Sequence, residues 1–168
     1  MTIKLLALTG ILLANVIATA QDFTIPALPT NKEEFIKSEP DIIAAAKWLE
    51  ANPVGNQPEK TTQVNAYVLK WITDSPNVSI EIDADFIVKM FDDNTQLLMV
   101  FKAGYTRYSL ENNYSKDKQK CYTAGIKSAL ANYTLGGDVK KNTLISKAIK
   151  EEREGRLLEW VGEKMKGK

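Results

Sequence analysis

Beyond residue 20, apolar side chains recur every three or four positions along most of the chain, the spacing of one face of an α-helix. Shorter patterns of the same kind surround Phe35 and Phe86. The longer amphipathic segments lie at about 38–52, 58–73, 94–112, 116–133, 142–154 and 156–165. The sequence therefore predicts an all-α fold, a single compact bundle of six to seven helices.

Two glycines interrupt the apolar faces of the strongest pair of segments. Gly104 lies on the face of segment 94–112, and Gly125 lies on the face of segment 116–133. Glycine inside a helix costs about 1 kcal/mol relative to alanine, so its presence on a buried face indicates close packing. We expect the two helices to form an antiparallel hairpin at the centre of the bundle and to cross closely at these glycines.

One stretch departs from the helical spacing. Val78, Ile80 and Ile82 alternate with polar residues, as in a strand, but no partner strand is evident. We expect a short extended connector at about 77–82 with its apolar side on the core. Ser38 and Ser115 are the expected N-caps of the helices that follow them.

The first 20 residues have the features of a cleavable signal peptide. Lys4 precedes an apolar run of about 14 residues, and Ala18-Thr19-Ala20 provides a small-residue cleavage site. A retained membrane anchor is the alternative, but a span needs roughly 20 apolar residues. We expect residues 1–20 to direct export to the periplasm or the exterior, 21–31 to be an extended lead-in, and 32–168 to form one helical domain without a transmembrane span.

Histidine is absent, and Cys121 is the only cysteine. Mechanisms that need an imidazole, such as Ser-His-Asp catalysis and His-ligated zinc, are thereby excluded. We expect no metal site and no cofactor. Cys121 fits a small apolar residue on a helix face, with an intermolecular disulfide or a reactive thiol as the alternatives.

The net charge of +1 conceals an uneven distribution. Residues 21–100 carry six basic and thirteen acidic residues, a net charge of −7, whereas residues 101–168 carry fifteen and eight, a net charge of +7. The two halves can pack side by side so that their fields cancel. Alternatively, a basic face attracts an anionic glycan, a lipid surface or an acidic protein. We expect no nucleic-acid partner.

Aromatic and basic residues are interleaved in the stretch 104–120. Helical spacing places Tyr105 and Tyr108 on the apolar face, where we expect them to be buried. The remaining residues of the stretch can hold an anion or stack on a sugar ring. The candidate binding residues are Arg107, Tyr114, Lys116, Lys118 and Lys120.

A group of acidic residues raises a second hypothesis. Two carboxyl groups about 5–10 Å apart are what glycoside hydrolysis requires. Acidic residues just before a helix are more commonly N-caps, however, and these acids precede expected helices. The group comprises Glu81, Asp83, Asp85, Asp92 and Asp93.

Three segments of the chain carry a resemblance to known proteins: SEPDIIAAAKWLEANPVG, VNAYVLKWITDSP and AGYTRYSLENNYSKDK. They resemble a family of small secreted or periplasmic, all-helical bacterial proteins with no assigned activity. The resemblance implies a bacterial, exported helical protein and supplies neither functional residues nor a mechanism. We favour a non-enzymatic binding or interaction role. The alternative is a carboxylate-dependent hydrolase that acts on envelope glycans or other polymers.

Overall fold

The protein is all-α, as the hydrophobic spacing predicts. The computed structural model describes residues 22–167, so the expected signal peptide at 1–20 lies outside the described residues. Within that range there are eight α-helices, one π-helical turn and no strand. The elements are α1 (Lys32–Lys37), α2 (Glu39–Ala51), α3 (Pro58–Asp74), η1 (Ala84–Val88), α4 (Lys89–Phe91), α5 (Thr95–Glu111), α6 (Lys118–Thr134), α7 (Thr143–Arg153) and α8 (Leu157–Lys166).

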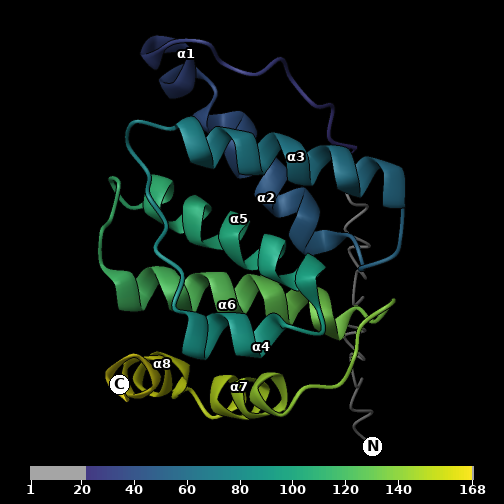
Figure 1. Cartoon of the computed structure of the whole chain (residues 1–168), viewed down its shortest axis with the longest axis vertical. Coiled ribbons are helices and arrows are strands. Elements are labelled where there is room, and N and C mark those ends of the chain that lie inside the picture. The colour runs from purple at the N-terminus through teal and green to yellow at the C-terminus, as the bar shows by residue number, and fades with distance from the viewer. Residues whose placement is uncertain (1–21, 168) are drawn as a thin grey trace, which may run out of the picture.

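Helix α5 lies at the centre of the molecule, between α2 and α6 (Figure 1). Val100 and Ala103 on one side of α5 pack into a core with α2 and α3. Leu97, Phe101 and Tyr105 on the other side pack into a second core with α6, α7 and α8. Since α5 contributes to both cores, its position determines how the two halves of the bundle meet.

Helices α5 and α6 form the expected hairpin, and the glycines lie where the helices cross. A Cβ atom on Gly125 would lie 2.6 Å from the carbonyl oxygen of Phe101. A Cβ atom on Gly104 would lie 2.5 Å from Cβ of Ser128 and 3.2 Å from Cα of Gly125. Real side-chain carbons do not approach this closely, which confirms the prediction of close packing.

The segment between α3 and η1 is the expected connector. Val78 is buried, Ile80 and Ile82 are half-buried, and Ser79 and Glu81 between them are exposed. The buried Tyr122 of α6 holds the end of this segment, because its hydroxyl donates to the Glu81 carbonyl at 2.6 Å and accepts from the Asp83 amide at 2.9 Å. These hydrogen bonds satisfy backbone groups that have no strand partner.

Two expected helix caps are wrong. The Ser38 hydroxyl donates to the Phe35 carbonyl and accepts from the Trp71 indole at 2.8 Å, so tertiary packing removes it from α2 capping. Helix α6 begins two residues later than predicted, because Asp117 accepts from the Lys120 amide and takes the N-cap position. Ser115 instead accepts from the Asp117 amide at 3.3 Å.

Candidate functional site

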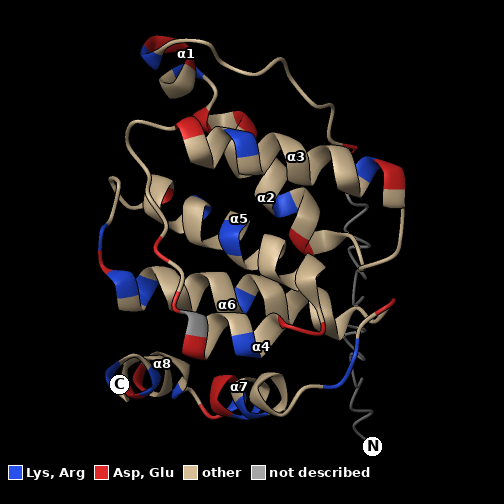
Figure 2. Ribbon diagram, in the orientation of Figure 1, with Lys and Arg blue, Asp and Glu red and all other residues tan. Residues whose placement is uncertain are grey.

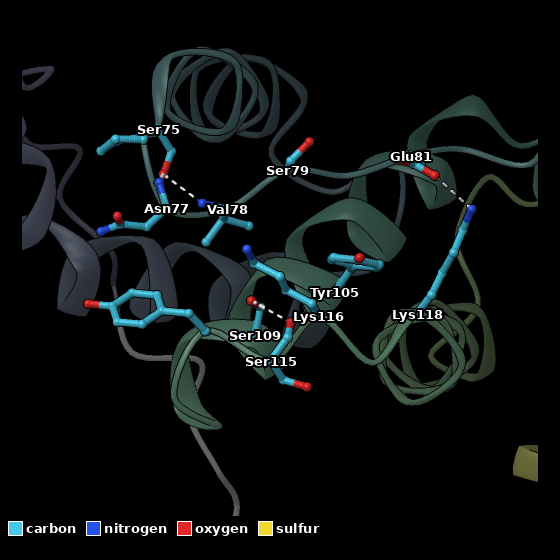
Figure 3. A pocket seen from close by; sticks show the side chains of 12 residues that line it. Ser75, Asn77, Val78, Ser79, Glu81, Tyr105, Ser109, Ser115, Lys116 and Lys118 are labelled. Carbon is cyan, nitrogen blue, oxygen red and sulfur yellow. Dashed lines mark hydrogen bonds and ion pairs between the residues drawn. The ribbon is translucent and has the colours of Figure 1, made fainter.

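A cavity of about 370 Å³ lies between the connector and the turn that joins α5 to α6. In Figure 3 the connector lies on one side of this space and the α5–α6 turn lies on the other. We call it the connector pocket. Its lining residues are Ser75, Pro76, Asn77, Val78, Ser79, Glu81, Tyr105, Ser109, Tyr114, Ser115, Lys116 and Lys118.

The connector wall is held at both ends. Ser75 follows α3, and its hydroxyl accepts from the amides of Asn77 and Val78 at 3.4 and 3.3 Å. Val78 then inserts into the core formed with α2 and α3, and Tyr122 fixes the backbone at the far end. The side chains of Asn77 and Ser79 make no side-chain hydrogen bond within residues 22–167, so both are free to meet a ligand.

The opposite wall contains a strained turn. Asn113 and Tyr114 have φ values of 54° and 56°, in the left-handed region that residues other than glycine rarely adopt. The turn persists because Ser109 and Ser115 bond to each other: the Ser115 amide donates to the Ser109 carbonyl, and the Ser109 hydroxyl donates to the Ser115 carbonyl, both at 3.1 Å. The Tyr114 hydroxyl also donates to the Glu39 carboxylate at 3.1 Å.

Two lysines contribute positive charge to the pocket. The Lys118 amine lies 3.0 Å from the Glu81 carboxylate and 5.7 Å from the centre of the Tyr122 ring. The hydrogen bond that Lys118 donates to Glu81 raises the pKa of Lys118, so the amine is charged at neutral pH. The Lys116 amine points toward the connector, and no ion-pair partner for it occurs among the described residues (Figure 3).

The other two predicted cations lie outside the pocket. Arg107 points from α5 toward α2, where it lies 2.8 Å from the Glu50 carboxylate, and its side chain is 21% exposed. Lys120 pairs with Asp117 at 3.1 Å on the surface of α6. Three of the five predicted binding residues, Tyr114, Lys116 and Lys118, therefore come together.

Tyr105 forms part of the pocket wall and is 6% exposed, whereas Tyr108 is half-buried. Burial raises the pKa of the Tyr105 hydroxyl, and the adjacent Cys121 raises it further. Cys121 itself is fully buried, as expected of a small apolar side chain, and burial raises the pKa of its thiol. Both groups stay protonated at neutral pH.

Two residues of the acidic group, Asp83 and Asp85, have partners at the start of η1. Asp83 accepts from the amides of Asp85 and Phe86 and caps η1, while Asp85 lies 3.3 Å from the Lys89 amine. Glu81 is the one acid of the group that lines the connector pocket. Sequence reasoning missed the connector wall, since its serines and asparagine have no distinctive spacing and Glu81 was grouped with capping acids.

A second charged hollow, of about 460 Å³, lies along α7 and α8. The buried Glu151 carboxylate lies 2.6 Å from the Lys147 amine and 2.9 Å from the Arg156 guanidinium. We call these three residues the Glu151 cluster. The Lys147 hydrogen bond and the charge of Arg156 keep the pKa of Glu151 below its ordinary value, so the carboxylate is charged at neutral pH and offsets part of the positive charge of its two partners.

A third hollow, between the lead-in and α3, is apolar. Ile25, Leu28 and Leu69 line it, and the last two are more than two-fifths exposed. The Lys70 amine at its edge is already paired with Asp74. Since no free charged group points into this groove, it has little to orient a polar ligand, and the connector pocket is the stronger candidate.

No protein-family model matches this chain, no curated protein is similar to it, and no solved structure matches its fold. The resemblance to secreted helical proteins therefore stays a prediction. Across residues 22–167, no helix combines the length and hydrophobicity needed to cross a membrane.

Proposed function

We propose that this protein is exported and acts without catalysis, as a binding protein that holds an anionic ligand in the connector pocket. Export is supported by the leader at residues 1–20. Binding is supported chiefly by one observation: Lys116, without an ion-pair partner among the described residues, and Lys118 line a cavity together with several hydroxyl groups. A cavity with converging polar groups is the usual form of a small-ligand site.

The charge distribution supports an anion as the ligand. Both lysines belong to the half of the chain with a net charge of +7, whose field attracts negative groups toward the pocket. Glu81 is the pocket's one carboxylate, and it balances one lysine, which leaves the pocket with a net positive charge. A hollow of this size suits an acidic sugar better than it suits a flat lipid surface.

The hydrolase alternative has less support. A general acid needs a raised pKa, whereas the shifted carboxyls of Glu34, Asp117 and Glu151 all have a lowered pKa, caused mainly by hydrogen bonds. In the connector pocket Glu81 has no second carboxylate beside it. The lining therefore contains the cations that anion binding needs, but it lacks the second carboxylate that hydrolysis needs.

Export can be tested by expressing the full chain in a bacterium and sequencing the N-terminus of the protein recovered outside the cytoplasm. A mature chain that begins at Gln21 supports the proposal, and an intact leader contradicts it.

Binding can be tested with the exported protein and polygalacturonate, a polymer with one carboxylate per sugar unit. We expect retention at low salt that weakens near 0.15 M, and none on neutral dextran. Lys116→Ala and Lys118→Ala should each weaken binding several-fold. Lys127→Ala, which removes the same charge from the exposed side of α6, is the matched control. Equal weakening by all three variants would contradict the pocket as the site.

A further inference from the structure

One contact in the connector pocket indicates which kind of anion Lys118 binds. Its amine already holds a carboxylate, that of Glu81, at 3.0 Å. Glu81 is 83% exposed and Lys118 is 41% exposed, so water competes for both groups. Exposed ion pairs of this kind contribute little to stability, which makes the carboxylate exchangeable.

Lys118 would keep its place if Glu81 left it. It is the first residue of α6, and its amine lies over the ring of the fully buried Tyr122. The Tyr122 hydroxyl holds the backbone of residues 81 and 83 rather than the Glu81 side chain. The Glu81 carboxylate can therefore swing into solvent without any movement of the connector.

The rest of the lining suits hydroxyl groups rather than a bare anion. On the connector wall, the side-chain amide of Asn77 and the hydroxyl of Ser79 make no hydrogen bond within residues 22–167. Ser115 accepts one hydrogen bond and can still donate, and Ser109 donates one and can still accept, on the other. Lys116 adds a second cation from the same wall (Figure 3). This mixture of available donors and acceptors suits the hydroxyls of a sugar ring.

We propose that the ligand of the connector pocket is a carboxylate-bearing sugar, and that its carboxylate displaces Glu81 from Lys118. This inference rests on the proposed binding function and adds the ligand class and an internal competitor. Glu81 occupies the site of the ligand's carboxylate in the free protein. The observed affinity is therefore reduced by the fraction of molecules in which Glu81 holds the amine.

The test is calorimetric titration of the exported protein with sodium glucuronate, with glucose, acetate and inorganic phosphate as comparison ligands. We expect glucuronate to bind about tenfold or more tightly than each of the others, since only it offers both a carboxylate and a hydroxylated ring. Tighter binding of phosphate would overturn the carboxylate assignment.

Two substitutions test the competition. Glu81→Gln keeps the size of the side chain and removes its charge, so glucuronate should bind about two- to fivefold more tightly. Lys118→Met should weaken binding about tenfold or more while the protein remains folded, which its melting temperature verifies. Glu59→Gln, an exposed glutamate on α3 outside the pocket, controls for the change in net charge.

The outcomes separate this inference from the proposed function. Weaker binding in Lys118→Met with unchanged affinity in Glu81→Gln would overturn the competition and leave the pocket as a binding site. Lysine-dependent retention of polygalacturonate without glucuronate binding would overturn the sugar-acid assignment alone. If Lys116→Ala and Lys118→Met changed neither glucuronate binding nor polymer retention, both proposals would fall.

Discussion

The connector pocket and the Glu151 cluster contain the same pair of groups, a glutamate and a lysine within hydrogen-bonding distance, in opposite settings. The Glu81 side chain is 83% exposed, whereas that of Glu151 is 6% exposed. Glu81 has one cationic partner, and Glu151 has two at under 3 Å. Burial and the number of partners, rather than the residue types, decide whether an ion pair is exchangeable.

The two regions also differ in what the carboxylate connects. Glu151 and Lys147 lie one turn apart on α7, and Arg156 immediately precedes α8; its amide also donates to the Glu151 carbonyl at 2.8 Å. The Glu151 cluster therefore closes the turn between two helices. Acidic and basic residues are mixed on α7 (Figure 2), which is consistent with charges neutralised locally. The Glu81 ion pair links the connector to α6, where Tyr122 already holds the connector backbone. Unlike Glu151, Glu81 therefore does not close a turn between two helices.

The largest expected effect comes from Gly125→Leu, which disturbs the scaffold beneath both regions. The new side chain must displace the Phe101 backbone, so we expect a loss of about 3 kcal/mol and a melting temperature lower by roughly 6–12 °C. Lys127→Leu, at an exposed position of the same helix, should stay within about 2 °C. An unchanged melting temperature for Gly125→Leu would contradict the close crossing.

Tyr122→Phe should affect the connector and spare the Glu151 cluster. Loss of the hydroxyl leaves the Glu81 carbonyl and the Asp83 amide without this partner, at a cost of about 1–3 kcal/mol. Amide hydrogen exchange should quicken at Asp83 and stay the same on α7. The control is Tyr133→Phe, a half-buried tyrosine for which no hydroxyl hydrogen bond occurs within residues 22–167. Equal exchange in both variants would refute the role of Tyr122.

Glu151→Gln should lower the melting temperature by a few degrees at pH 7, because two cations lose their buried partner. The pKa of Glu151 is lower in the folded protein than its ordinary value of 4.5, so its charge stabilises the fold above that value. This stability is lost as pH falls through the folded pKa. Thermal melts of both proteins should therefore differ at pH 6–7, and the difference should shrink as pH falls below 4.5 through the folded pKa. A constant difference down to pH 3 would exclude the carboxylate charge as the cause.

The smallest expected effect on stability is that of Glu81→Gln. Substitutions at exposed sites of this kind change stability by about 0.5 kcal/mol or less, so the melting temperature of Glu81→Gln should differ from that of the native chain by at most about 2 °C. Glu81→Gln and Glu151→Gln are the same chemical change at two sites. The difference between their melting temperatures therefore compares the exposed setting with the buried one directly. A loss as large as that of Glu151→Gln would make Glu81 a structural residue.

Much of the fold could be predicted because it depends on local spacing. Helical periodicity located the long helices, and glycines on the apolar faces located the α5–α6 crossing. The cap at Ser38 could not be predicted, since a serine before a helix has the same signature whether or not an indole such as that of Trp71 reaches it.

The candidate site was predictable only in part. Tyr114, Lys116 and Lys118 are close in sequence, so a single turn brings them together. The same stretch suggested Arg107 and Lys120, but helix direction turns them toward Glu50 and Asp117. The facing wall lies more than thirty residues earlier in the chain, and no local pattern relates the two.

By itself, the sequence determined the helical character of the described chain, the close approach of two helices, and the absence of imidazole chemistry. Each of these follows from residue type or from spacing within a few turns of backbone. Only the tertiary structure decided which lysine faces a cavity, which carboxylate is buried, and which wall lies opposite the α5–α6 turn. Burial and contact between distant segments set the strength of a charge interaction, and neither is encoded in local spacing.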